Sequence, residues 1–345
     1  MQPHVFDWTA TELAKHGARF LEEADEPAYR LKQIGKWLYD RTPDTFSEMK
    51  DLPKALRDRL ESRFVLHPLK LEREQCSTDG TRKFLWSRGS NGDVESVLIP
   101  DRDRVTYCIS SQAGCPVKCP FCATGYGGFQ GQLGAAEIVD QVVQMRSKSG
   151  QPPTNIVFMG MGEPLLNFDA VYRALEIFTD SRQLNVGSRR ITVSTVGVPD
   201  RIRELQRRFP QIKLAISLHA ARDELRDELV PLNRQYPLDR LIGVLRETTR
   251  RTGRTVTVEY VILPGVNDSD RDIREIVRLL DGIPARINLI GFNPFAGAPY
   301  EKPPVRRLVQ FRERLAAHFP GPVTLRRARG ADIDGACGQL SLRSP

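Results

Sequence analysis

The chain has 345 residues, of which 40% are hydrophobic and 8% aromatic, and a chain of this length can bury about 75% of its unfolded surface in a core. Lys and Arg outnumber Asp and Glu by 51 to 43, which gives a formal net charge of +8. No apolar run reaches the length of a membrane span, and the first residues lack a basic region followed by a signal-type apolar segment, so we expect a cytoplasmic protein with no membrane partner.

The positive charge is unevenly distributed. Residues 1–100 carry 16 basic and 17 acidic side chains, so the whole surplus lies in residues 101–345. Clusters such as Arg306-Arg307 and Arg326-Arg327-Ala328-Arg329 would attract a polyanion such as RNA, although a solvated basic surface without such a partner gives the same pattern. The six cysteines, three of them clustered, do not suggest a secreted disulfide framework, so their thiols are available for metal binding or catalysis.

Residues 1–68 are predicted to form a helical module. Apolar residues recur there at steps of three and four, the spacing of one helix face: Tyr29, Leu31, Ile34, Trp37 and Leu38. A further helix is expected to begin at Leu52-Pro53 and to carry Leu56, Leu60 and Phe64. We expect the Trp and Tyr side chains of this module to lie in its core.

Residues 69–101 are predicted to form a β-meander that links this module to the rest of the chain. The segments 69–78 and 81–88 flank Asp79-Gly80, a dipeptide typical of hairpin turns, and a third strand follows over 93–100. Glu95 lies in this third strand, in Val94-Glu95-Ser96-Val97. A charged residue at such a position is usually exposed, so the pattern alone assigns Glu95 no role.

Residues 102–345 alternate between predicted strands and predicted helices. The strands are expected near 104–110, 154–160, 190–195, 212–218, 255–262 and 285–291, and the helices near 134–148, 168–180, 199–208, 237–252, 270–281 and 304–318. Such alternation predicts a parallel sheet with crossover helices. Because six repeats are fewer than the eight of a closed barrel, we predict an α/β fold with an open partial (βα)6 barrel.

Three cysteines follow the first of these strands, in Cys115-Pro116-Val117-Lys118-Cys119-Pro120-Phe121-Cys122. A structural zinc ion needs four protein ligands, and no fourth Cys or His lies nearby in the sequence. An iron–sulfur cube held by only three cysteines keeps one iron open for another ligand. The spacing Cys-x-x-x-Cys-x-x-Cys resembles the signature of the radical S-adenosylmethionine (SAM) enzymes, while a zinc site completed from elsewhere, or three unrelated core thiols, remain alternatives.

Further polar residues stand at the expected carboxyl ends of the strands, where α/β folds collect their active sites. These residues are Gly160-Met161-Gly162-Glu163-Pro164, Ser194-Thr195, Ser217-Leu218-His219 and Asn293-Pro294-Phe295. Because parallel strands end at one edge, we expect all of them to share one rim with the cysteine loop.

Four segments of the chain closely resemble one family, the radical SAM adenosine methyltransferases of RNA known as the RlmN/Cfr family. They are residues 108–122, residues 159–167, Ala215-Ile216-Ser217-Leu218-His219-Ala220, and residues 329–340 with Cys337. The likeness extends from the helical module to Leu340. The chain departs from the family at Gly131 and Gln132, where relatives commonly have a basic residue and an Asn.

The resemblance implies two cofactors. Cys115, Cys119 and Cys122 would hold a [4Fe–4S] cluster whose open iron binds the amino and carboxylate groups of SAM. The remaining SAM contacts would come from Gly162, Glu163, Ser194, Ser217, Leu218, His219 and Asn293. Hydroxyl, imidazole and amide groups suit this task because they bind ribose hydroxyls and a carboxylate without adding a competing charge.

The resemblance also implies three catalytic residues. Cys337 would take a methyl group from one SAM, and a radical derived from a second SAM would convert that group into a carbon radical that adds to adenine. Glu95 would take the ring proton. Cys108 would then attack the Cys337 sulfur, which releases methylated RNA and leaves a disulfide to be reduced.

The implied function is methylation of C2 of an adenosine in the peptidyl-transferase region of 23S rRNA, and of the adenosine 3′ of the tRNA anticodon. The implied partners are these RNAs and an electron donor such as flavodoxin or ferredoxin with its reductase, and we expect a monomer. The alternatives are a relative that methylates C8 of the same adenosine, a radical SAM enzyme acting on proteins or small molecules, and a non-catalytic metal-containing RNA-binding protein.

Overall fold

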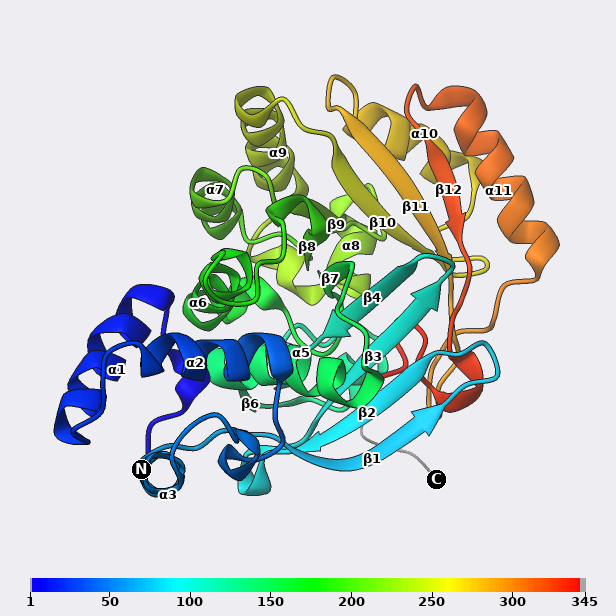
Figure 1. The fold of residues 1–345 in the computed structure, drawn as a ribbon. Helices are drawn as coiled ribbons and strands as arrows, with labels where there is room; N and C mark the ends of the chain where they lie inside the picture. Colours follow the sequence, from blue (N-terminus) through cyan, green and yellow to red (C-terminus); the bar gives the residue numbers. More distant parts are fainter. Residues whose placement is uncertain (1, 342–345) are drawn as a thin grey trace.

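One ten-stranded sheet organises the computed structural model, which describes residues 2–341 (Figure 1). Its strand order is β1-β2-β3-β4-β7-β8-β9-β10-β11-β12. The strands are β1 (Lys70–Cys76), β2 (Arg82–Ser87), β3 (Val94–Asp101), β4 (Arg104–Ile109), β7 (Asn155–Phe158), β8 (Ile191–Thr195), β9 (Lys213–Ser217), β10 (Val256–Ile262), β11 (Ala285–Gly291) and β12 (Val323–Arg326). The sheet is open, with β1 and β12 at its two edges, as expected for a partial barrel.

The sheet has an antiparallel part and a parallel part. Strands β1 to β4 pair antiparallel, and from β4 through β12 every pairing is parallel. The predicted meander is therefore confirmed as three strands, and it continues the barrel sheet through the β3–β4 pairing. Asp79-Gly80 lies in the β1–β2 hairpin, where Gly80 has φ +84°, a conformation that glycine adopts without strain.

All six predicted strands of the parallel part are present, and β12 adds a strand that the prediction missed. β12 is only four residues long and ends in Arg326 at the start of a basic run, so it offers no alternating pattern to detect. It pairs in parallel with β11. The parallel part of the described chain is thus one strand longer than the predicted six.

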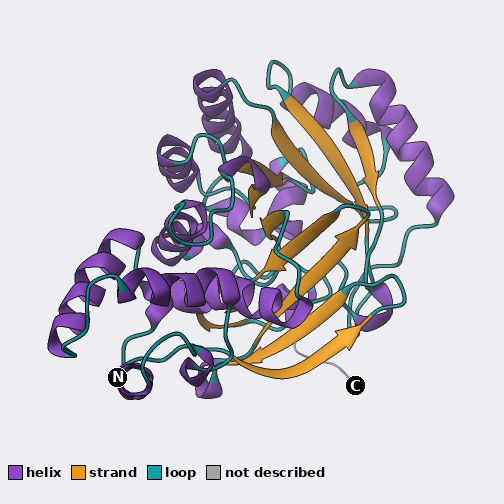
Figure 2. Ribbon diagram, in the orientation of Figure 1, coloured by secondary structure: helices purple, strands orange, loops and turns teal. Residues whose placement is uncertain are grey.

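Helices line the outside of the curved sheet (Figure 2). They are α5 (Ala135–Ser149), α6 (Phe168–Thr179), α7 (Pro199–Arg208), α9 (Leu238–Thr252), α10 (Asp270–Leu279) and α11 (Val305–His318), while the short α8 (Asp223–Leu229) lies at the carboxyl ends of β8 and β9. The six predicted helices are confirmed. The short α8 was missed because its acidic and basic residues give no apolar face that is long enough to recognise.

The N-terminal segment forms α1 (Ala10–Glu23), α2 (Arg30–Lys36) and α3 (Lys54–Arg63), with Leu56 and Leu60 of α3 buried as predicted. α1 begins at a capping box in which Thr9 and Glu12 bond to each other's backbone. Tyr39 is buried, but Tyr29 is 59% exposed, so the prediction that the aromatic residues lie in the core is wrong for Tyr29. Its position just before α2, at the edge of the module, leaves its ring in solvent under the Arg30 guanidinium.

The helical segment contacts α5, as Figure 1 shows. Asp7 Oδ1 accepts a hydrogen bond of 3.0 Å from Ala136 N and so caps the first turn of α5. His67 binds Asp140 of the same helix at 2.6 Å. Within residues 2–341, none of the helices is long and apolar enough to cross a membrane.

Candidate active site

The predicted site residues lie at one edge of the sheet because the parallel strands that carry them end there. Ser194 is on β8, Ser217 is the last residue of β9, and Asn293 follows β11 by two residues. The Ser194 and Ser217 hydroxyl oxygens are 3.3 Å apart. The cysteine loop follows β4, and the Gly162-Glu163 turn follows β7.

A small two-stranded sheet that the sequence did not reveal shapes the cysteine loop. It pairs β5 (Gln112–Gly114) with β6 (Phe129–Gln132), and α4 (Ala123–Tyr126) lies between them. Cys115 N donates to Gly128 O at 3.1 Å, closing the loop at its base. Gly114 has φ +69°, and a Cβ there would lie 1.8 Å from Gly128 O, so only glycine fits.

The three clustered thiols suit an iron–sulfur cluster in their chemistry. All three are free thiols, and each of Cys115 and Cys122 interacts electrostatically with Cys119. Burial raises the pKa of Cys115 to about 12 and raises that of Cys119 as well. Bound iron would supply the positive charge that favours the thiolate forms of Cys115 and Cys119.

Within residues 2–341 no group of three or more His, Cys, Asp and Glu side chains could hold a metal ion by itself. In an iron–sulfur cluster each thiolate binds its own iron, so its sulfurs surround a cube and not a single ion.

Glu163 ties the end of β7 to the end of β8. Its Oε1 accepts a hydrogen bond from Leu165 N at 2.9 Å, and its Oε2 accepts one from Val196 N at 2.8 Å. Burial raises the pKa of this carboxyl group. The preceding Gly162 has φ +94°, and a Cβ there would lie 2.5 Å from Gln112 Cβ, so the turn packs against the cysteine-loop sheet.

Gln132, one of the two departures from the family, has a structural task at this place. Its Oε1 accepts from Gln112 Nε2 at 2.9 Å and its Nε2 donates to Leu166 O at 3.0 Å. Gln112 Oε1 in turn accepts from Glu163 N at 2.7 Å. These hydrogen bonds of the Gln112 and Gln132 side chains connect β5, β6 and the turn after β7.

His219 stands after β9 in a left-handed conformation, with φ +60°. Its Nδ1 accepts a hydrogen bond of 3.0 Å from Val261 N, and the Phe121 ring packs edge-on against it at 4.7 Å. Burial, aided by the Arg226 cation, lowers the pKa of His219 to about 3. Since Nδ1 is an acceptor, the neutral ring carries its proton on Nε2 and can donate from there.

Arg226 on α8 was not predicted, and it holds the ends of two strands together. Its guanidinium donates to the carbonyl oxygens of Leu218, Ser217 and Val196, and to Asn233 Oδ1 at 2.6 Å. The side chain is 1% exposed. Leu218 is thereby fixed through its backbone oxygen while its side chain packs in the core.

Cys108 and Cys337 lie near enough to interact electrostatically, although 229 positions separate them in the sequence. Burial raises the pKa of Cys108 to about 12, and the neighbouring Cys337 sulfur adds to this effect. Cys337 is reached by solvent, but the surrounding protein still raises its pKa, and the Arg326 cation acts in the opposite direction. Asn293 Nδ2 donates to Cys337 O at 3.0 Å and holds the Cys337 loop at the rim.

Glu95 is buried and ion-paired, contrary to the usual exposure of a charged residue at such a position. Its Oε1 is 3.1 Å from Lys83 Nζ, and both side chains are 2% exposed. Its Oε2 accepts a hydrogen bond of 3.0 Å from Ser341 N, four residues beyond Cys337. The segment that carries Cys337 therefore reaches Glu95.

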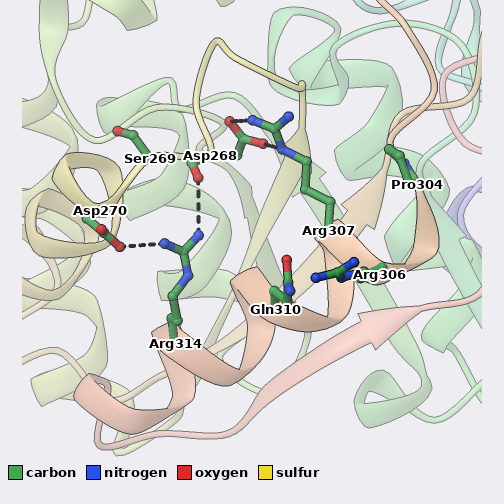
Figure 3. A pocket seen from close by; sticks show the side chains of 8 residues that line it. All are labelled: Asp268, Ser269, Asp270, Pro304, Arg306, Arg307, Gln310 and Arg314. Atoms are coloured by element: carbon green, nitrogen blue, oxygen red, sulfur yellow. Dashed lines mark hydrogen bonds and ion pairs between the residues drawn. The ribbon is translucent and has the colours of Figure 1, made fainter.

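A cavity of about 550 Å³ lies elsewhere on the molecule, between α10 and α11 (Figure 3). Arg307 pairs with Asp268, and Arg314 pairs with Asp270 at 2.5 Å. Asp268 therefore neutralises part of the positive charge of the Arg306-Arg307 cluster, which was expected to attract a polyanion. None of the predicted site residues lines this cavity.

Sequence reasoning missed Lys83, Arg226 and Arg326 at the site. Lys83 stands next to Arg82 and Arg226 stands next to Asp227, as charged surface residues commonly do. Arg326 is one of three arginines in residues 326–329. Only burial distinguishes Lys83 and Arg226 from surface cations, and burial of a charge follows from tertiary packing.

The chain matches two family models. Residues 109–280 match the radical SAM superfamily, and residues 6–66 match the ribosomal RNA large subunit methyltransferase N-terminal domain. Two relatives are named dual-specificity RNA methyltransferase RlmN. The one from Halorhodospira halophila is 48% identical over 94% of this chain and 90% of its own length. The one from Alcanivorax borkumensis is 45% identical over 91% of this chain and 85% of its own length.

A solved structure agrees with these matches. A radical SAM methyltransferase from Sphaerobacter thermophilus is 44% identical and superimposes with a TM-score of 0.92 over 98% of this chain and 99% of that one. Radical SAM enzymes use SAM and an iron–sulfur cluster, and the thiols and polar rim described above fit these groups. The chain therefore belongs to the RlmN family of radical SAM RNA methyltransferases.

Proposed function

We propose that this enzyme methylates C2 of an adenosine in the peptidyl-transferase region of 23S rRNA and of the adenosine 3′ of the tRNA anticodon. The gathering of Cys108, Cys337 and Glu95 at one rim is the observation that carries the proposal. Relatives named dual-specificity RNA methyltransferases support two RNA substrates. The basic surplus of residues 101–345 suits a polyanionic substrate.

Cys115, Cys119 and Cys122 would hold a [4Fe–4S] cluster, with SAM beside it. When bound, these groups supply a methyl group and a SAM-derived radical that removes hydrogen. Both oxygens of Glu163 accept backbone hydrogen bonds that fix the turn, so the SAM ammonium would bind a backbone carbonyl of the Gly162-Glu163 turn or the remaining lone pairs of the carboxylate.

The other SAM contacts follow from the donors and acceptors at the rim. His219 would donate from Nε2 to a ribose hydroxyl, because its Nδ1 is occupied by Val261 N. The Ser194 and Ser217 hydroxyls lie close enough to bind one polar group together. Leu218 would contribute apolar contact, and Asn293 would exchange its bond to Cys337 O for SAM when the loop opens.

The reaction uses Cys337 as the methyl carrier. The Cys337 thiolate takes a methyl group from one SAM molecule, and hydrogen removal from that methyl group lets its carbon add to the adenine ring. Glu95 accepts the ring proton. The Cys108 sulfur then bonds to the Cys337 sulfur while the carbon–sulfur bond to RNA breaks, and the Cys108 proton goes to the methylene carbon, which becomes the methyl group. The surplus electron of the radical adduct would return to the iron–sulfur cluster, and each turnover leaves a disulfide that an external reductant must open.

In the present structure Ser341 N donates a hydrogen bond to Glu95 Oε2. The adenine therefore reaches Glu95 only after the segment following Cys337 has moved. Such a movement suits Cys337, which must react with SAM first and with RNA afterwards.

Product analysis tests the proposal. Reconstituted enzyme is incubated without oxygen with methyl-labelled SAM, a reductant, and 23S rRNA or tRNA that lacks the modification, and the digested RNA is analysed by mass spectrometry. We expect label in 2-methyladenosine from both RNAs. Label in 8-methyladenosine would overturn the C2 assignment, and label in rRNA alone would overturn the dual substrate range.

A further inference from the structure

A buried cation lies beside the proposed general base. Lys83 on β2 and Glu95 on β3 belong to adjacent antiparallel strands in which Lys83 faces Val97. Glu95 is two residues from Val97, so the two charged side chains leave the same face of the sheet as diagonal neighbours. Their Nζ and Oε1 atoms are 3.1 Å apart, and each side chain is 2% exposed.

Contacts other than this ion pair also join β2 and β3. β2 and β3 are also joined by their backbone ladder and by a hydrogen bond of 2.5 Å from Trp86 Nε1 to Ser96 Oγ. The Phe84 and Trp86 rings stack on each other at 5.4 Å. Because a buried ion pair is seldom more stabilising than apolar side chains of similar size, the charges at this position call for a chemical explanation.

The pair also touches the Cys337 segment on both sides. Lys83 Nζ donates to Asp334 O at 3.5 Å, three residues before Cys337, and Glu95 Oε2 accepts from Ser341 N, four residues after it. The cation and the carboxylate thus lie where this segment crosses β2 and β3. The shortest contact with the ammonium group is made by Oε1, whereas Oε2 accepts the hydrogen bond from the Cys337 segment.

We propose that Lys83 is a positioning residue for the methyl transfer to RNA, an inference that rests on the proposed function. Its ammonium group fixes Oε1 of Glu95 and balances the buried negative charge, so that Oε2 faces the adenine. The ring proton moves to Oε2 while the electron pair of the carbon–hydrogen bond stays on the ring. Lys83 itself exchanges no proton or electron.

Separate measurement of two half-reactions, formation of methyl-Cys337 and release of methylated RNA, distinguishes this positioning role from a structural one. Formation of methyl-Cys337 does not involve Glu95, whereas release of methylated RNA does. We expect Lys83→Met to form methyl-Cys337 at the wild-type rate, and to release methylated RNA at least about tenfold more slowly, because a well-placed base contributes about 10²- to 10⁴-fold. Lys83→Arg, which keeps the cation, should restore most of the rate.

A kinetic isotope effect gives a second readout. With RNA that carries deuterium at adenine C2, Lys83→Met should show a larger isotope effect on product release than the wild type, because proton removal becomes rate-limiting. If Lys83→Met folds poorly, the double variant Lys83→Met/Glu95→Gln removes both charges together. We expect the double variant to fold and to be no slower than Glu95→Gln alone.

Lys148→Met is the matched control, since Lys148 forms an ion pair of 2.7 Å with Asp44 at the surface. It should leave both half-reactions unchanged. Wild-type release by Lys83→Met, or equal slowing of both half-reactions without a larger isotope effect, would overturn the inference. Failure of the wild-type enzyme to form methyl-Cys337 or methylated RNA would instead contradict the proposed function.

Discussion

Arg226 shows how one buried side chain shapes the rim. It donates to three carbonyl oxygens and to Asn233, and no solvent can replace those hydrogen bonds. Burial lowers the pKa of its guanidinium to about 10, so it remains a cation at neutral pH. The cation keeps the ends of β8 and β9 in position for Ser194, Ser217 and His219.

We therefore predict that Arg226→Met lowers the free energy of unfolding by about 3 kcal/mol, because it leaves buried acceptors without a donor. Urea unfolding of the iron-loaded protein measures this loss. Arg182→Met is the control, since Arg182 pairs with Asp180 at an exposed site, and it should cost less than about 0.5 kcal/mol. Equal losses in the two variants would show that Arg226 is not a structural centre of the rim.

His219 is predicted to act as a neutral donor. Because its pKa is lowered to about 3, the ring is uncharged throughout the neutral range, and its Nε2–H remains available to SAM. His219→Phe keeps the ring but removes the donor, so the Kd for SAM should rise about tenfold, the equivalent of about 1.4 kcal/mol. Equilibrium binding measures the change, and an unaltered Kd would remove His219 from the SAM site.

At the scale of elements, the cysteine loop depends on one glycine of β5. Gly114 and Gly150 both have positive φ, but a Cβ on Gly114 would lie 1.8 Å from Gly128 O, whereas a Cβ on Gly150 would meet nothing within 4 Å. The two residues therefore separate backbone strain from steric collision.

We predict that Gly150→Ala costs about 1 to 2 kcal/mol, the penalty of a left-handed conformation. Gly114→Ala should cost at least about 2 kcal/mol more through collision with the backbone, and should lower the iron content per chain after reconstitution. Thermal unfolding and iron analysis give both values. Full iron loading of Gly114→Ala would mean that the β5–β6 pairing does not shape the cysteine loop.

Periodicity predicted the long elements and failed for the short ones. The strands β4 and β7 to β11 and the helices α5 to α7 and α9 to α11 carry enough apolar residues to be recognised, and even the four-residue β7 has the apolar run Ile156-Val157-Phe158. The strands β5, β6 and β12 have three or four residues, and such segments form because neighbouring strands supply their partners. Their existence is a tertiary property.

The same distinction applies to the site. The rim residues could be predicted because strand ends of a parallel sheet share one edge, and the motif at Cys115 to Cys122 is local in sequence. The ion pair of Lys83 with Glu95 and the hydrogen bonds of Arg226 could not, because each depends on which charged side chains the packing buries.

At the scale of the whole molecule, His67 joins the N-terminal helices to the barrel. Its Nδ1 lies 2.6 Å from Asp140 Oδ1, and its Nε2 lies 2.8 Å from Pro43 O. Both partners are acceptors, so the ring carries a proton on each nitrogen. Although burial opposes the charge, Asp140 and the more distant Asp44 raise the pKa of His67 above 6.5.

A raised pKa in the folded state stabilises the protein fully below the unfolded value of 6.5, and the contribution is lost as the pH rises through the folded pKa. We predict that the wild-type protein loses more of its free energy of unfolding than His67→Gln as the pH rises above the unfolded value of 6.5 and through the raised pKa of His67. Urea unfolding across this range measures the difference. Parallel pH profiles for the two proteins would show that His67 is uncharged in the fold.

In the proposed mechanism Cys337 carries the methyl carbon to RNA and Cys108 releases it. The most direct test incubates Cys108→Ala with labelled SAM, a reductant and unmodified 23S rRNA, and then examines the protein by denaturing electrophoresis and mass spectrometry. We predict a covalent protein–RNA adduct joined through Cys337, which Cys108→Ala/Cys337→Ala does not form. Release of methylated RNA by Cys108→Ala at the wild-type rate, with no adduct, would contradict the account.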